Sequence, residues 1–132
     1  KLRFSGTNDS TKLGEYAWFA DKSVGSFDFK EREVGTGSTH PVATKKPNAL
    51  GIYDLTGNVW EWTSDWYSKN YPTSEKNKPV LNPRGPEKGL ARSLRGGSWF
   101  SFAYGCRNSN RWFYGNRFPR NDDIGFRCVK DI

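Results

Sequence analysis

Several residue types and patterns are missing from this sequence of 132 residues, and each absence excludes some classes of protein. No run of 18 apolar residues occurs, so no membrane-spanning helix is expected. Methionine is absent even at the first position, and no signal-peptide pattern opens the chain. We therefore expect a mature product, a trimmed chain or a fragment, of a length that suits one domain with one core.

Cysteine and histidine are scarce. Cys106 and Cys128 lie 22 residues apart without a CxxC motif, which argues against a cysteine zinc site. They could pair in an oxidising compartment or stay as free thiols, and both alternatives remain open. The single histidine, His40, is expected at the surface. One histidine and no Ser/His/Asp set offer no catalytic constellation, and the adjacent Asp122 and Asp123 are expected to be solvated.

Positive charge is in modest excess, with 21 Lys and Arg against 14 Asp and Glu, for a net charge of +7. Residues 94–132 carry seven bases and three acids, and residues 1–93 carry fourteen and eleven. No run of five basic residues occurs, although a nucleic-acid-binding surface normally has a dense basic stripe. We therefore expect a basic surface without a nucleic-acid partner.

The pattern along the chain predicts short strands, long loops and little helix. A helical turn is expected near residues 11–13. Residues 59–66 alternate between apolar and polar in the manner of a strand, and residues 94–99 and 124–129 are also expected to be strands. Residues 68–93 contain four prolines and predict a long irregular connection.

Four motifs together resemble the formylglycine-generating enzyme (sulfatase-modifying factor) family. They are NALGIYDLTGNVWEW at residues 48–62, RGGSW at 95–99, CRNSNR at 106–111 and GFR at 125–127. The resemblance implies an α+β, C-type lectin-like fold with short twisted antiparallel strands, little helix and long ordered loops. It covers only the C-terminal half of a family domain, so residues 1–132 are expected to form a single domain that lacks the upstream half.

The resemblance also implies a structural calcium site. The motif places side-chain oxygens at Asp54 and Glu61 and backbone carbonyls at Gly57 and Val59, and calcium prefers such hard oxygen ligands. The alternative is that Asp54 caps a turn while Glu61 makes an internal hydrogen bond. The family's other calcium site is not expected, because Val34 occupies the position of its aspartate.

Family enzymes hold copper between two cysteines, and here Ser101 and Cys106 occupy those two positions. Cuprous ions favour thiolates, and serine is a poor substitute. We therefore expect a non-catalytic relative without copper. Two alternatives remain: an oxidase that acts on a peptide cysteine, with a second thiolate from elsewhere, or an accessory structural module.

Residues 100–123 have an unusual composition. They contain no Lys, Glu, Gln or Met, although the other 108 residues hold 11 Lys and 6 Glu. Changing the first two bases of an asparagine codon can give every residue in this segment except Trp112. This resembles the variable proteins of diversity-generating retroelements, whose variable segment lies at the end of the same fold. Aromatic rings among Asn, Ser, Gly and Arg are also typical of recognition surfaces.

The sequence therefore predicts a ligand-binding display domain at a cell surface or in secreted form. A protein or glycan of another cell or a phage is the expected partner, and the domain is expected to be a monomer. The predicted ligand-binding residues are Phe100, Ser101, Phe102, Tyr104, Asn108, Asn110, Trp112, Phe113, Tyr114, Asn116, Phe118, Asn121 and Asp122.

Overall fold

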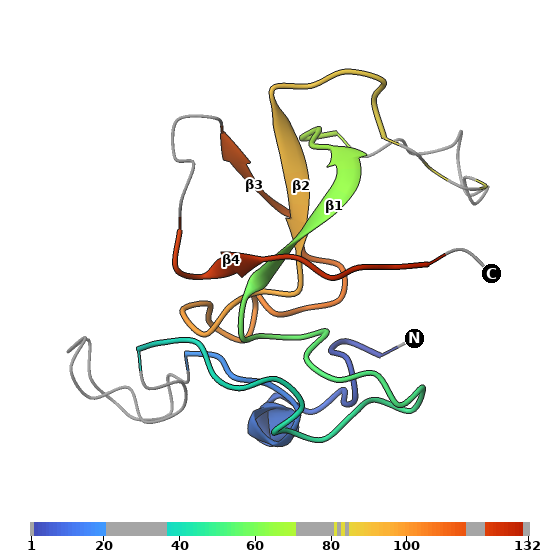
Figure 1. The fold of residues 1–132 in the computed structure, drawn as a ribbon. Coiled ribbons are helices and arrows are strands. Elements are labelled where there is room, and N and C mark those ends of the chain that lie inside the picture. Colours follow the sequence, from blue (N-terminus) through green and yellow to red (C-terminus); the bar gives the residue numbers. More distant parts are fainter. Residues whose placement is uncertain are drawn as a thin grey trace.

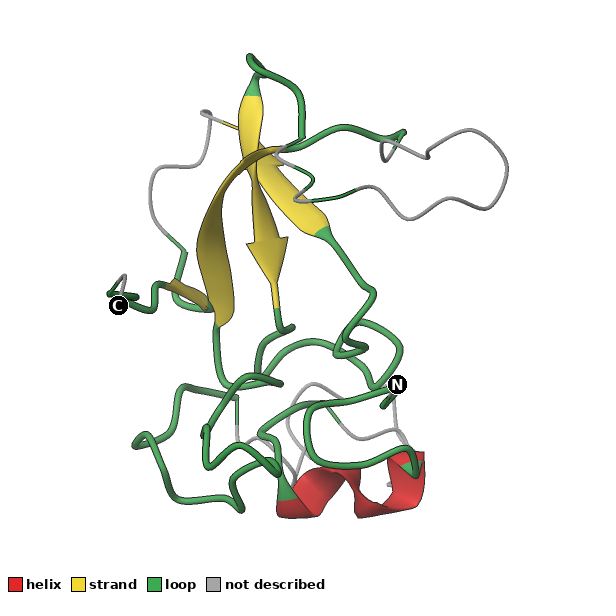
Figure 2. Ribbon diagram, turned by 90° about the vertical axis from the view of Figure 1, so that its right-hand side faces the viewer, coloured by secondary structure: helices red, strands yellow, loops and turns green. Residues whose placement is uncertain are grey.

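The computed structural model describes residues 2–20, 37–70, 81, 83, 85–115 and 121–130. A curled four-stranded sheet in the order β3-β2-β1-β4 lies above a layer of loops (Figure 1). The strands are β1 (Trp60–Trp66), β2 (Ala91–Arg95), β3 (Trp112–Gly115) and β4 (Ile124–Gly125). Figure 2 places the short helix of the described residues at the opposite end from the sheet. The predicted C-type lectin-like architecture, with little helix, is confirmed.

The sheet is mixed. β1 pairs antiparallel with β2, in agreement with the antiparallel strands that the resemblance implies. β2 also pairs antiparallel with β3, a strand that the sequence analysis did not predict. β4 instead runs parallel to β1, with Trp60 opposite Ile124. A register shift between Trp62 and Trp66 interrupts the β1–β2 ladder. Such irregularities increase local twist, which agrees with the curled shape of this sheet.

Two predicted strands have different bounds in the structure. β2 ends at Arg95 because Gly96 and Gly97 follow it with φ angles of +95° and +80°, outside the extended region. Gly97 also passes close to a neighbour, since a Cβ atom there would lie 2.6 Å from Cys106 Sγ. The strand expected to run from residue 124 to 129 is only the two-residue β4.

The helix η1 (Ser10–Glu15) is a 3-10 helix in the region where a helical turn was predicted. Asp9 caps it, because its side chain accepts a hydrogen bond from the Thr11 amide at 2.9 Å. Leu13 is buried and joins a small core beneath the sheet. The core members are Phe4, Leu13, Ala17, Phe19 and Cys106. No helix in the described ranges has the length and apolar character needed to cross a bilayer.

Candidate ligand-binding site

A cavity of about 340 Å³ opens between the sheet and the loop that follows β2. We call it the aromatic cavity, and its lining is Trp60, Phe100, Ser101, Phe102, Tyr104, Gly105, Asn110, Trp112, Tyr114 and Asp123. Seven of the thirteen predicted ligand-binding residues are in this lining. The structure therefore brings together side chains that are up to 14 positions apart along the predicted variable segment.

The sheet and the loop each contribute exposed rings to this cavity. Trp112 and Tyr114 alternate along β3, so both side chains lie on the same face of the sheet. Trp112 is 52% exposed, and on the loop side Tyr104 is 65% and Phe100 46% exposed. Trp60 is nearly buried and belongs to the scaffold side of the cavity. Solvent therefore reaches rings contributed from both sides of the opening.

Hydrogen bonds within its own turn and to Ala20 hold the loop that carries Phe100 and Phe102 in place. The Ser98 amide donates to Ser101 Oγ at 3.1 Å, and the Ser101 amide donates to the Ser98 carbonyl at 3.0 Å. The Ala20 amide donates to the Ser101 carbonyl at 2.9 Å. The Ser101 hydroxyl thus lines the cavity while it also stabilises its own turn.

Asp123 is a cavity residue that the sequence analysis missed. Its Oδ2 accepts a hydrogen bond from Ser98 Oγ at 2.8 Å, and its carbonyl accepts from the Trp60 amide at 2.8 Å. Its Oδ1 is buried and has no hydrogen-bond partner. Burial raises the pKa of this carboxyl, and the neighbouring Asp122 adds to the effect. The expectation that both aspartates are solvated is therefore wrong for Asp123, which packs inward directly before β4.

Two predicted binding residues lie away from the aromatic cavity. Phe113 sits between Trp112 and Tyr114 on β3, so the strand period of two turns it to the other face. There its ring stacks on Tyr67 at a centroid distance of 4.3 Å. Asn108 lines a second cavity instead. The predicted residues therefore do not form one continuous patch.

The remaining predicted residues border the site or lie outside the described part of the chain. Asn121 donates a hydrogen bond to the Tyr114 hydroxyl, so it supports the cavity wall. Asp122 is exposed and is not part of the cavity lining. Asn116 and Phe118 lie outside the described residues.

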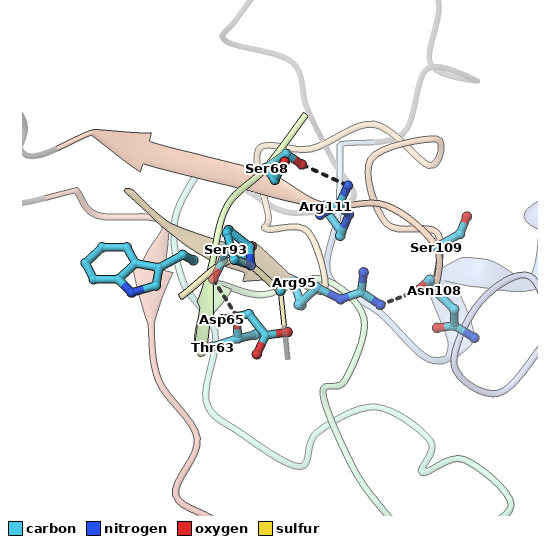
Figure 3. Close-up of a pocket in the computed structure, with 11 residues that line it drawn as sticks. Thr63, Asp65, Ser68, Ser93, Arg95, Asn108, Ser109 and Arg111 are labelled. Atoms are coloured by element: carbon cyan, nitrogen blue, oxygen red, sulfur yellow. Dashed lines mark hydrogen bonds between the residues drawn. The ribbon is translucent and has the colours of Figure 1, made fainter. Parts of the chain in front are cut away.

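The second cavity, of about 640 Å³, is polar (Figure 3). Two arginines that line this cavity donate hydrogen bonds to backbone carbonyls. Arg95 donates to the Asn108 and Asn110 carbonyls, and Arg111 donates to the Ser68 carbonyl at 3.1 Å. These bonds fasten the loop before β3 to the sheet, which is a structural role.

The positions of the family's copper ligands do not fit a copper ion here. Cys106 is 1% exposed within the core, and burial raises the pKa of its thiol to about 12. The other position is Ser101, which supplies a hydroxyl. At neutral pH this pair offers one protonated thiol and one alcohol, whereas cuprous ions favour thiolates. Cys128 is exposed and does not pair with Cys106.

The predicted calcium ligands fit an ion in part. Asp54 accepts from the Ala43 amide through Oδ2 at 2.7 Å, while its Oδ1 is buried without a partner. An oxygen of this kind is available to a cation. Glu61 accepts three hydrogen bonds from Arg127, at 2.7 to 3.1 Å. A bound ion would therefore share the Glu61 carboxylate with that guanidinium.

Comparison with known proteins agrees with this architecture. The formylglycine-generating enzyme of Streptomyces coelicolor is 41% identical over 104 residues, which are 75% of this chain and 31% of that enzyme. The serine/threonine-protein kinase Pkn1 of Chlamydia trachomatis is 40% identical over 97 residues, 74% of this chain and 16% of the kinase. The chain thus spans about a third or less of the length of these relatives.

Among solved structures, Treponema denticola variable protein 1 has a TM-score of 0.73 and 34% identity, and the match covers 96% of this chain and 40% of that one. The family model for the sulfatase-modifying factor enzyme 1-like domain matches residues 4–132. The predicted family is thereby confirmed, and this chain belongs to the family of sulfatase-modifying factor enzyme 1-like domains.

Proposed function

We propose that this chain is a non-catalytic ligand-binding domain whose aromatic cavity is a replaceable recognition surface, as in the variable proteins of diversity-generating retroelements. One observation carries the proposal: seven of the predicted ligand-binding residues, all within the segment predicted to vary, converge on a single cavity with exposed rings. Rigid rings provide contact area at a low entropy cost. The likeness to Treponema denticola variable protein 1 supports the same function.

The alternative is an oxidase of the parent family, which the 41% identity to a formylglycine-generating enzyme favours. Ser101 and the protonated Cys106 thiol argue against it, because copper activation of oxygen in that family uses two thiolates. An accessory structural module is a third possibility. Rings buried against another part of the protein would favour it, whereas Tyr104 and Trp112 are exposed in the described chain.

The proposed partner is a protein or glycan on another cell or a phage, met at a cell surface or in the medium by a monomeric domain. Calcium is proposed as a structural ion held by Asp54, Glu61 and the carbonyls of Gly57 and Val59. It would stiffen the turn that leads into β1 and so keep one wall of the aromatic cavity in place.

A substitution library tests the proposal. Phe100, Tyr104 and Trp112 would be randomised together in the full-length protein and sorted for folding with a conformation-dependent reporter. We expect most substitutions to fold, because these three side chains are 46%, 65% and 52% exposed. A matched library at Leu94, Leu13 and Phe19, which are buried, should mostly fail. Equal intolerance in both libraries would contradict a replaceable surface.

A further inference from the structure

We propose that the aromatic cavity binds a cationic side chain, a lysine ammonium or an arginine guanidinium, presented by a partner protein. This inference rests on the function proposed above and names the chemistry of its ligand. Three features of the cavity support it: an acidic group without a full set of partners, a wall of aromatic rings, and the absence of Lys and Arg among the described residues of its lining.

The acidic group is Asp123. Its carboxylate has two oxygens, of which Oδ2 receives the Ser98 hydroxyl while Oδ1 is buried and unpartnered. Leaving a buried acceptor unsatisfied is unfavourable, and for a charged group the cost is larger. Asp123 is part of the cavity lining, so its carboxylate lies beside any group that enters, and a turn of the side chain would present the buried Oδ1 to that group. A donor that is also positively charged would relieve both the missing hydrogen bond and the repulsion from Asp122.

The wall consists of aromatic rings. Trp60, Phe100, Phe102, Tyr104, Trp112 and Tyr114 all line the cavity with Asp123. Aromatic faces carry negative electrostatic potential, which attracts ammonium and guanidinium groups. Rings around a carboxylate therefore favour a cation with an aliphatic stem, because the rings contact the stem while the carboxylate pairs with its end.

No described residue in the lining is Lys or Arg, so an incoming cation meets no like charge among them. A neutral sugar could accept contacts from the rings, but its hydroxyls would leave the charge of Asp123 uncompensated. Anionic sugars would be repelled. A volume of about 340 Å³ is at the small end of ligand pockets and suits one side chain more than an entire domain. These points favour a protein partner over a glycan.

Calorimetric or NMR titration of the full-length protein at pH 7 tests the inference. The probes are three peptides of the form acetyl-Gly-X-Gly-amide, in which X is lysine, arginine or the uncharged norleucine. Because a hydrogen bond to a charged group contributes about 1.5–3 kcal/mol, we expect the lysine and arginine peptides to bind about tenfold or more tightly than the norleucine peptide.

Two variants identify the group responsible. Asp123→Asn keeps the shape and the contact with Ser98, and it should reduce the affinity for both cationic peptides to that for norleucine. Asp65→Asn is the matched control, because Asp65 lines the polar cavity instead, and it should leave all three affinities unchanged. Thermal unfolding of each variant confirms that it is folded.

The possible outcomes distinguish failure of this inference from failure of the proposed ligand-binding function. Equal binding of all three peptides would overturn the inference while the aromatic cavity remained a recognition site. An equal loss in Asp65→Asn and Asp123→Asn would also overturn it, because the attraction would then come from overall charge. Failure of every peptide to bind would overturn the inference, while the substitution library would still decide whether the cavity is a replaceable surface.

Discussion

The carboxyl of Asp123 is expected to lower the stability of the free protein at neutral pH, and the proposed cationic ligand would offset this loss. Its pKa in the fold is raised, chiefly by burial. A raised pKa means that folding favours the protonated acid, so this stabilising contribution is present below the unfolded pKa and is lost as the pH rises through the folded pKa. At neutral pH the charged Asp123 therefore destabilises the protein without a ligand.

This gives a prediction for pH dependence. Asp123→Asn should have a larger free energy of unfolding than the wild type at pH 7, and the difference should vanish at about pH 3, where the acid is protonated in both states. Urea unfolding at the two pH values measures it. A variant that is less stable than the wild type at pH 7 would show that the charged carboxylate is stabilising, contrary to this account.

The environment of Cys106 leads to a prediction about copper binding and therefore about catalysis. Its thiol has a pKa of about 12 and Ser101 replaces the second cysteine, so the wild type should bind no cuprous ion with high affinity at pH 7. Ser101→Cys supplies the missing sulfur and should increase the affinity at least about tenfold. Competition with a cuprous chelator measures both proteins. Tight, stoichiometric copper binding by the wild type would favour the oxidase.

At the residue scale, seven of the residues predicted to bind ligand lie around one cavity, and their role stays a prediction. Composition identified seven cavity residues because aromatic and polar side chains are concentrated in one segment. Phe113 lies on the opposite face from its neighbours Trp112 and Tyr114, a separation that composition cannot predict because it ignores the strand period of two. Asp123 was missed since charge alone predicted solvation, although its place directly before β4 is a signal for an inward side chain.

Among the elements, the turn after β2 depends most directly on single residues. Gly97 has a φ of +80°, and a Cβ atom there would lie 2.6 Å from Cys106 Sγ and 3.0 Å from its Cα. Gly97→Ala should therefore lower the free energy of unfolding by about 2–4 kcal/mol, through backbone strain together with overpacking. Chemical denaturation measures the loss.

Gly51 provides a matched control for this substitution. Its φ is +75°, nearly that of Gly97, but a Cβ atom there would meet nothing within 4 Å. Gly51→Ala should thus show the backbone cost alone, about 1 kcal/mol. Equal losses at the two positions would mean that the close approach to Cys106 does not contribute.

Three of the four strands were predicted to exist, with bounds that differ from the structure, and β3 was not predicted. The alternation of apolar and polar residues at positions 59–66 gave β1 within one residue, although only Trp60 of that strand is buried. The bounds of β2 depend on where Gly96 and Gly97 take positive φ values, which follows from packing against distant residues. Local sequence carries little information about such contacts.

At the scale of the whole molecule, bound calcium is predicted to stabilise the folded state. Calcium in excess should raise the melting temperature, and at 100 times the dissociation constant the stabilisation would be about 2.7 kcal/mol. Asp54→Ala should remove the calcium effect, since Oδ1 of Asp54 is the unpartnered buried oxygen at the site. Differential scanning calorimetry with calcium and with chelator measures it. An unchanged melting temperature in the wild type would contradict a structural ion.

The overall fold could be predicted from the order of the four family motifs more than from the hydrophobic periodicity of the sequence. Short strands and long loops fit many architectures, and the four motifs at residues 48–62, 95–99, 106–111 and 125–127 selected one of them. The TM-score of 0.73 to Treponema denticola variable protein 1 agrees with that choice. The mixed sheet could not be predicted locally, because the parallel pairing of β4 with β1 joins residues more than 60 positions apart.

The proposed function requires that the aromatic-cavity positions within residues 100–123 form a replaceable surface on a fixed scaffold. Deep sequencing of codons 95–130 in many cells of the source population tests it most directly. The account predicts that substitutions concentrate at the aromatic-cavity positions Phe100, Phe102, Tyr104, Asn110 and Tyr114, while residues 95–99 and 125–127 stay fixed. A uniform sequence across the population, or changes spread equally over both sets, would contradict it.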